Sequence, residues 1–168
     1  MKFELLDKVL QASTTRVVAV KHVSLAEEYL ADHFPTFPVM PGVLMLEAAT
    51  QACGWMMQLR SNFARPIVVL KEAKNVKYGH FVAPGQALRI EADWVKGDDC
   101  SGQFKINGVV ELGGTAGEKT AFTARLELAY FSLTEKNPAM RHLDESLITH
   151  ARNRWTVIAP TGAMTVSV

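Results

Sequence analysis

The sequence predicts an α+β fold in which a curved antiparallel β-sheet wraps around one long central α-helix. Two observations predict this class. The second half of the chain alternates apolar and polar residues with a period of two, which is typical of strands with one buried face. Residues 34–59 instead hold one charged residue, Glu47, among 26 residues. Such a segment predicts a helix that protein surrounds on all sides, and a curved antiparallel sheet with short turns would cover it.

The first elements follow from local composition. Two strands are expected over residues 3–10 and 16–23, because apolar and β-branched residues fill them and a polar Ser-Thr-Thr turn separates them. A short helix is expected over 26–30. Two prolines then deny regular structure to residues 32–40 and force an extended path. We therefore expect a rigid loop directly before the buried helix.

The long helix should begin near Pro41-Gly42, because proline suits the first turn, and should run to about Leu59. Of the 15 residues in 43–57, 11 are apolar, with no polar stripe at helical spacing. The same stretch is rejected as a membrane span. It holds glycine and the carboxylate of Glu47, whose insertion alone would cost about 2.5–3.5 kcal/mol.

The later elements are strands followed by a different kind of tail. Strands are expected over 67–76, 88–95, 104–112 and 122–130, with turns at Gly97-Asp98-Asp99 and Gly113-Gly114. After Pro138, charged residues around a tryptophan predict a surface helix. The expected organisation is one domain over 1–133 and a C-terminal extension over 134–168, which either docks on the domain or binds a partner.

Composition excludes several classes of protein. The chain of 168 residues has 18 Lys+Arg against 17 Asp+Glu and no basic run, which argues against nucleic-acid binding. Its N-terminus mixes charged with apolar residues and so lacks the core of a signal peptide, and a cytoplasmic protein is expected. Cys53 and Cys100 lack metal-ligand spacing, so neither a disulfide framework nor a zinc site is expected.

Three residues around the buried helix are candidates for chemistry. Glu47 has no lysine or arginine near it in sequence; if buried, it would hold a proton near neutrality as a general acid does, unless folding brings a distant arginine to it. His33 lies in the proline-bounded loop, where a fixed imidazole suits a general base, although a loop histidine is also a common surface or capping residue. Gly42 stands where unpaired helix N–H groups could receive a carbonyl oxygen, or simply marks the helix start.

Read together, these residues fall in the stretch HFPTFPVMPGVLMLEAATQACG, residues 33–54. It closely resembles the active-site segment of the β-hydroxyacyl-acyl carrier protein dehydratases of type II fatty acid synthesis, which have the hot-dog fold. That family has HFP, then PGV, then a glutamate 14 positions after the histidine, as Glu47 follows His33. Residues 81–88, FVAPGQAL, are similar to the family's VxPGDxL. The resemblance covers about residues 3–131.

The resemblance implies dehydration of (3R)-hydroxyacyl-[acyl carrier protein] to trans-2-enoyl-[acyl carrier protein] in fatty acid biosynthesis. His33 would remove a proton from C2 of the thioester, and Glu47 would act as the acid that helps the C3 hydroxyl leave as water. The N–H of Gly42 would polarise the thioester carbonyl. No metal or organic cofactor is implied.

The resemblance also implies partners. Acyl carrier protein would deliver the chain on its phosphopantetheine arm, and the protein would form a homodimer, or a trimer of dimers, in which His of one subunit meets Glu of the other. The candidate residues of the substrate tunnel beside the helix are Phe34, Val43, Leu46 and Gln51. The candidate cations for carrier docking are Arg60, Arg65, Lys71, Lys74 and Lys77, which otherwise form a solvated strand edge.

The chain departs from the family pattern at three places. Asp32 stands where the family usually has glycine before the catalytic histidine, which adds a charge beside His33. The usual PHRYPF-like segment is absent before Phe3, and the tail beyond Thr134 is extra. Asp32 and the tail keep open a non-catalytic dehydratase-like subunit that binds acyl carrier protein. A hot-dog acyl thioesterase is also an alternative, since related folds use a helix carboxylate to activate water on acyl thioesters.

Overall fold

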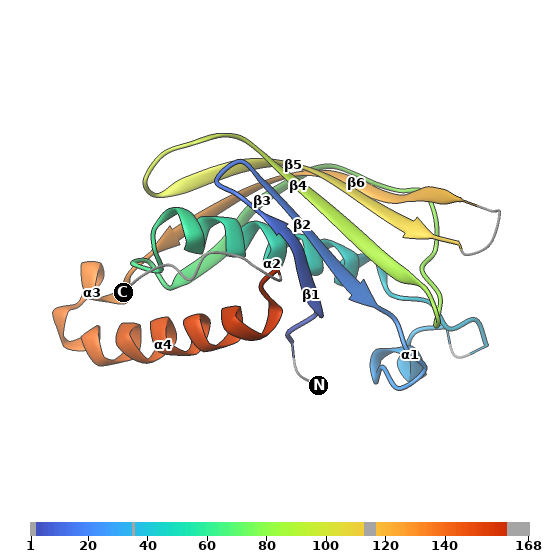
Figure 1. The fold of residues 1–168 in the computed structure, drawn as a ribbon, viewed down its shortest axis with the longest axis horizontal. Coiled ribbons are helices and arrows are strands. Elements are labelled where there is room, and N and C mark those ends of the chain that lie inside the picture. The colour runs from blue at the N-terminus through green and yellow to red at the C-terminus, as the bar shows by residue number, and fades with distance from the viewer. Residues whose placement is uncertain (1–2, 35, 113–116, 161–168) are drawn as a thin grey trace.

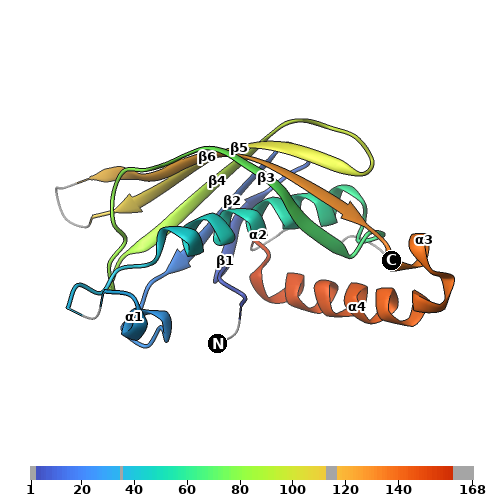
Figure 2. The ribbon, with the colours of Figure 1, turned by 180° about the vertical axis from the view of Figure 1, so that it is seen from behind.

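The computed structural model describes residues 3–34, 36–112 and 117–160, and in this part of the chain six antiparallel strands form one curved sheet of order β1-β2-β4-β5-β6-β3. The strands are β1 (Lys8–Ala12), β2 (Arg16–His22), β3 (Ile67–Tyr78), β4 (Ala87–Gly97), β5 (Ser101–Glu111) and β6 (Glu118–Phe131). The helices are α1 (Tyr29–Asp32), α2 (Gly42–Arg60), α3 (Leu133–Lys136), the 3₁₀ helix η2 (Pro138–Met140) and α4 (Arg141–Ile158). Helix α2 lies under the concave face of the sheet (Figures 1 and 2).

The concave face of the sheet is the core of the molecule. Strands β4, β5 and β6 alternate buried and more exposed residues over most of their length, as predicted. Ala92, Ile106 and Ala124 face one another across these three strands in one buried row. Gly108 lies opposite Phe122, whose ring comes within 2.2 Å of where a Cβ on the glycine would stand. Small residues therefore make room for large ones, and the sheet packs directly on α2.

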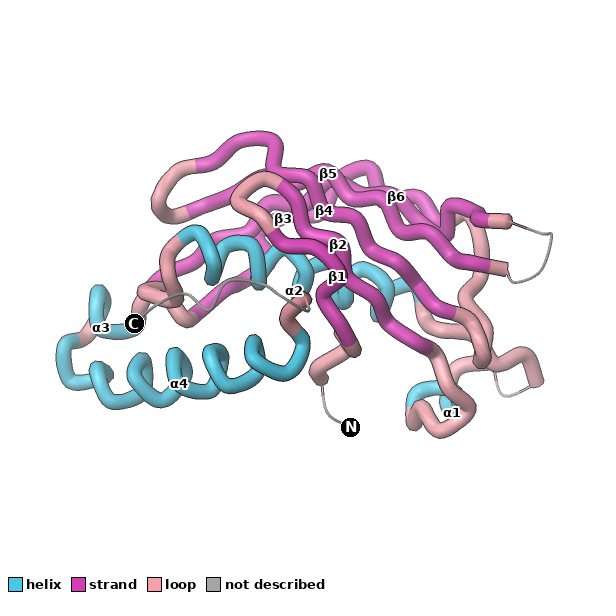
Figure 3. Tube along the Cα trace, viewed as in Figure 1, coloured by secondary structure: helices cyan, strands magenta, loops and turns pink. Residues whose placement is uncertain are grey.

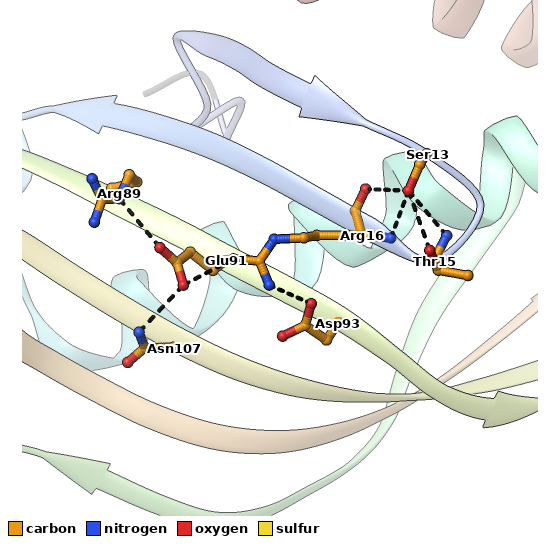
Figure 4. A network of polar contacts seen from close by, with 7 residues as sticks. All are labelled: Ser13, Thr15, Arg16, Arg89, Glu91, Asp93 and Asn107. Atoms are coloured by element: carbon orange, nitrogen blue, oxygen red, sulfur yellow. Dashed lines mark hydrogen bonds and ion pairs between the residues drawn. The ribbon is translucent and has the colours of Figure 1, made fainter.

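The outer face carries a polar network instead (Figure 4). Arg16 of β2 bonds Asp93 at 2.5 Å and Glu91 at 3.1 Å, both on β4. Glu91 also contacts Arg89 at 3.4 Å and accepts a hydrogen bond from Asn107 of β5. Because these groups are partly solvated, each pair contributes little to stability, and together they link three neighbouring strands on the water side.

Two predicted N-terminal boundaries are wrong. The strand expected over 3–10 begins only at Lys8, because the consecutive residues Leu5 and Leu6 are both buried, which a half-buried strand with a period of two does not allow. The short helix forms at Tyr29–Asp32 rather than over 26–30. By contrast, α2 starts at Gly42 with Pro41 as its N-cap and ends at Arg60, one residue beyond the predicted end.

The chain covers α2 less completely than the sequence predicts. The sheet covers one side, and α4 packs on another, where Trp155 approaches Trp55 with ring centroids 5.4 Å apart. Figure 3 shows the resulting order of sheet, α2 and α4. However, Val43 is 69% exposed, and Glu47 is only partly buried. One face of α2 is therefore left partly exposed by the described residues.

The C-terminal extension is helical and docked. The predicted surface helix is α4, and it is joined to β6 through α3 and η2. The carboxylate of Asp144 in α4 accepts hydrogen bonds from the N–H groups of Leu133 and Thr134, at the first turn of α3. The predicted Gly97-Asp98-Asp99 turn joins β4 to β5. The predicted turn at Gly113-Gly114 lies outside the described residues. In the described ranges no helix is long and apolar enough to cross a membrane.

Candidate active site

A pocket of about 370 Å³ opens at the N-terminal end of α2. Of the residues singled out by sequence, His33, Phe34, Gly42 and Val43 line it. Most of its wall is apolar, and three of its lining residues, the two histidines His33 and His80 and the tyrosine Tyr78, carry polar side chains. An apolar cavity with a few convergent polar groups is the usual form of a small-molecule site.

The loop before α2 holds the His33 ring in place. His33 caps the C-terminus of α1 by donating its N–H to Tyr29 O at 3.2 Å, and its ring lies 4.3 Å from that of Phe34. Phe34 has a φ of 49°, a left-handed conformation that bulky residues rarely adopt and that marks local strain. The Nδ1 atom of His33 is buried and has no hydrogen-bond partner among the described residues. The described residues thus leave one buried ring nitrogen of His33 without a hydrogen bond, which is uncommon for a buried polar atom.

The start of α2 faces the same pocket. The first N–H groups of a helix have no intrahelical acceptor and carry the positive end of its dipole. A Cβ on Gly42 would lie 2.8 Å from Cε1 of Tyr78, so glycine lets the tyrosine ring lie against the helix start. Burial raises the pKa of the Tyr78 phenol, which therefore stays protonated at neutral pH. The sequence analysis identified the glycine but not the tyrosine.

His80 was not among the predicted site residues, yet it lines the pocket with His33. Beyond the end of β3, the N–H groups of Gly79 and His80 both donate to Ala121 O, at 2.8 and 3.2 Å, and hold this segment against β6. Phe81 then meets Phe37 edge to face at 5.3 Å. One signal was available: His80-Phe81 repeats the His33-Phe34 dipeptide and, like it, precedes a Pro-Gly pair.

Glu47 does not line this pocket. It lies further along the partly exposed face of α2, where its Oε1 accepts a hydrogen bond from Gln51 Nε2 at 2.9 Å. Within the described parts of the chain, no lysine or arginine pairs with it, so a structural ion pair does not account for this carboxylate. Glu47 is thus only partly buried in the single chain.

The remaining tunnel candidates lie elsewhere. Gln51 lines a second pocket of about 280 Å³ between α2, β3 and α4, whereas Leu46 lines neither of the two pockets. Of the four predicted tunnel residues, only Phe34 and Val43 thus share a pocket with His33. Among the described residues, no group of three or more His, Cys, Asp or Glu side chains is placed to hold a metal ion.

The predicted docking cations do not gather at the pocket. Arg60 stacks on the Trp94 ring at 3.9 Å and, 18 residues after Gly42, lies about 27 Å along α2 from its start. Three others are held in ion pairs: Arg65 with Glu135 at 3.1 Å, Lys71 with Glu127 at 2.6 Å, and Lys74 with Glu72 at 2.7 Å. Lys77 lines a different depression on the sheet. These five cations follow the far end of α2 and the length of β3, and none of them lines the pocket that holds His33.

Comparison with known proteins decides the family. The family model of the FabA-like domain matches residues 1–120. The chain belongs to this family. This FabA-like chain is 37% identical over 94 residues to the 3-hydroxyacyl-[acyl-carrier-protein] dehydratase FabZ of Lactococcus lactis subsp. cremoris (strain MG1363), covering 56% of this chain and 65% of that protein. It is 37% identical over 95 residues to FabZ of Solibacter usitatus, covering 59% of it. The chain thus spans less than two thirds of the length of these curated relatives.

Solved structures of other proteins share the fold of this FabA-like chain. The dehydratase heterocomplex ApeI:P from Xenorhabdus doucetiae matches with a TM-score of 0.64 at 20% identity, over 83% of this chain and 90% of that one. The E. coli PaaI protein matches with a TM-score of 0.54 at 12% identity, over 73% and 81%. The predicted hot-dog fold and the predicted family resemblance are both confirmed. Helices α3 and α4 lie beyond the residues that the family model matches.

Proposed function

We propose that this FabA-like chain dehydrates 3-hydroxyacyl-[acyl carrier protein] to the trans-2-enoyl thioester. The observation that carries the proposal is the pocket at the start of α2, where His33 and Gly42 line one largely apolar cavity. A base beside a set of unpaired helix N–H groups suits removal of a proton next to a thioester carbonyl. The FabZ relatives, which are named for this reaction, support the same choice of substrate.

His33 and Gly42 carry out the first half of the reaction, which is removal of the C2 proton. His33 takes the proton from C2, and the electron pair that remains spreads onto the thioester oxygen. Developing negative charge on that oxygen is stabilised by the N–H of Gly42 and by the positive end of the α2 dipole. The apolar wall excludes water, which strengthens these interactions. Tyr78 and His80 line the same cavity and add polar contacts for the thioester or its arm.

The second half belongs to Glu47. Its carboxyl group gives a proton to the C3 hydroxyl as the C3–O bond breaks, and water leaves. The enoyl double bond forms between C2 and C3, and the proton held by His33 returns to Glu47 through solvent before the next turnover. Both groups act as acid or base only, and the reaction needs no metal and no organic cofactor.

A second subunit completes the site in this proposal. Glu47 does not line the pocket of its own chain, so we assign the pocket of each subunit to the Glu47 of its partner. Strand β3 supports such a dimer: it is 12 residues long, it is one edge of the sheet, and Val69 and Leu70 on it are partly exposed. Only its first four residues, 67–70, are all apolar, and an exposed apolar edge of this kind is normally paired or covered. A dimer through β3, alone or in a trimer of dimers, would pair the backbone groups of this edge strand.

The proposed partner that delivers the substrate is acyl carrier protein, in the cytoplasm. Because the predicted docking cations do not gather at the pocket, we assign no surface to the carrier. Its phosphopantetheine arm would enter the mouth that Phe34 and Phe81 flank, both of which are more than half exposed.

The test is a direct assay of the purified full chain with a 3-hydroxyacyl-[acyl carrier protein] and with the matching coenzyme A ester. We expect formation of the enoyl thioester, and a loss of about 10²- to 10⁴-fold in kcat for His33→Ala and for Glu47→Gln. Release of free thiol without enoyl product would instead identify a thioesterase. Carrier binding without turnover at any chain length would identify a non-catalytic subunit.

A further inference from the structure

The C-terminal helix α4 lies beyond the residues that the family match covers, yet hydrogen bonds and the backbone of residues 3–6 connect it to Glu47. The connection runs from Arg154 to the N-terminal segment, residues 3–6, from there to Gln51, and from Gln51 to Glu47. Every link joins parts of the chain that are distant in sequence, except the last, which joins neighbouring turns of α2.

The first link holds the N-terminal segment against α4. Arg154 Nη2 donates to Leu6 O at 3.1 Å, and its Nε lies 3.1 Å from Glu4 Oε2. Arg154 thus binds both the backbone and a side chain of the segment. Leu5 and Leu6 are each 2% exposed, so burial holds the segment from the other side. A segment outside the sheet is thereby given one conformation.

The second link fixes the side-chain amide of Gln51. Its Oε1 accepts from Leu5 N at 2.9 Å, and its Nε2 donates to Phe3 O at 2.6 Å. A backbone N–H can only donate and a backbone carbonyl can only accept. These two contacts therefore fix the positions of Oε1 and Nε2 in the Gln51 amide. The NH₂ group must therefore face Phe3 O and Glu47, with the Nε2 to Oε1 distance to Glu47 being 2.9 Å.

We propose that Arg154 is a positioning residue for Glu47, acting through the N-terminal segment and the Gln51 amide. When the segment is held, Gln51 offers Glu47 only a donor, which fixes one carboxyl oxygen and leaves the other for the substrate. When the segment is released, the amide can turn over and present its oxygen, which accepts the carboxyl O–H that the substrate hydroxyl would otherwise receive. The proposal rests on the proposed function, in which Glu47 is the acid. It gives the extension a role in the reaction.

The test uses two arginines of α4. Arg154→Met removes the contacts of this arginine with Leu6 O and Glu4. The matched control is Arg152→Met, which alters an arginine of the same helix that lies over the Phe63 ring at 5.7 Å. In the dehydration assay we expect about a tenfold fall in kcat for Arg154→Met with KM unchanged, and no change for the control. In a Gln51→Ala background, Arg154→Met should have no further effect on kcat, because the link is already broken. An equal fall in both backgrounds would mean a general loss of structure and would overturn the proposal.

A second measurement does not depend on activity. Hydrogen exchange of the Leu5 backbone amide and of the Gln51 side-chain amide should speed up in Arg154→Met and stay unchanged in Arg152→Met. Unchanged exchange at both amides in Arg154→Met would overturn the proposal, even if the chain proved to be an active dehydratase. Faster exchange in a chain that turns over no hydroxyacyl substrate would instead keep the link and reject the proposed function.

Discussion

At the scale of single residues, the pocket depends on close approaches that only particular side chains allow. Gly42 lets the Tyr78 ring lie against the start of α2, and the strained backbone of Phe34 holds the ring of His33. His80 reaches the same cavity from beyond the end of β3. Three segments of the chain therefore meet at one helix terminus: residues 33–34, the start of α2 and residues 78–81. The first contributes one polar side chain and the last contributes two.

The approach of Tyr78 to Gly42 gives a prediction for Gly42→Ala. The added Cβ would stand 2.8 Å from the tyrosine ring, which is half exposed and can swing away. We expect a stability loss of up to about 1 kcal/mol and a clear rise in KM, because the pocket wall moves.

The double variant checks the cause. In a Tyr78→Ala background, Gly42→Ala should cost almost no stability, since nothing remains to clash with. Chemical denaturation of the four proteins measures this, and an equal cost in both backgrounds would contradict the assignment of Tyr78 as the neighbour.

At the scale of elements, α4 is fixed to the domain by Asp144. Its carboxylate is almost completely buried, and it accepts hydrogen bonds from Ser132 Oγ, from Thr134 Oγ1 and from two N–H groups at the start of α3. Burial alone would raise the pKa of the Asp144 carboxyl, but the bonds from Ser132, Thr134 and Leu133 outweigh it and hold that pKa well below its usual range. The ionised form therefore stabilises the docked extension.

This lowered pKa predicts a pH dependence with a definite sign. A carboxyl whose pKa is lower in the folded state contributes stability above its unfolded value, about 3.9, and loses it as the pH falls through the folded value. The melting temperature of Asp144→Asn should lie below that of the wild type at pH 7, and the gap should narrow below about pH 4. Glu145→Gln, an exposed neighbour, serves as the control. A gap that stays constant from pH 7 to pH 2 would contradict the account.

The elements also explain what sequence could and could not predict. The predicted bounds of α2 agree with the observed ones to within one residue, because Pro41 and Gly42 are local signals of a helix start. The predicted start of β1 does not agree, because Leu5 and Leu6 are held by tertiary burial that has no local period. Tyr78 and His80 lie more than 40 residues from His33 and were missed, since nothing in a linear sequence states that β3 ends over the start of α2.

At the scale of the whole molecule, the apolar character of α2 has a different meaning from the one that the sequence suggested. The lack of a polar stripe predicted complete cover, but one face of α2 is left partly exposed by its own chain. Glu47 and Val43 lie on that face. This apolar composition, with one partly exposed face, is consistent with the proposed dimer through the edge strand β3.

The proposed dimer predicts the effect of a charge on the edge strand. Leu70 lies on β3 and is 39% exposed in the single chain, so Leu70→Lys should leave the fold intact while opposing edge pairing. We expect the mass measured by light scattering to fall to that of a monomer, together with activity. Val95→Lys is the matched control, because Val95 is also exposed but lies on the interior strand β4. A Leu70→Lys protein that keeps the wild-type mass would contradict a dimer through β3.

In the proposed dimer, His33 of one subunit and Glu47 of the other make one dehydratase site. Complementation between two inactive variants tests this shared site. His33→Ala and Glu47→Gln should each be nearly inactive alone. When the two variants are co-expressed, half of the dimers are mixed and each mixed dimer holds one intact site, so we expect about a quarter of the wild-type rate of enoyl formation. If the co-expressed pair is no more active than the single variants, the shared site is wrong.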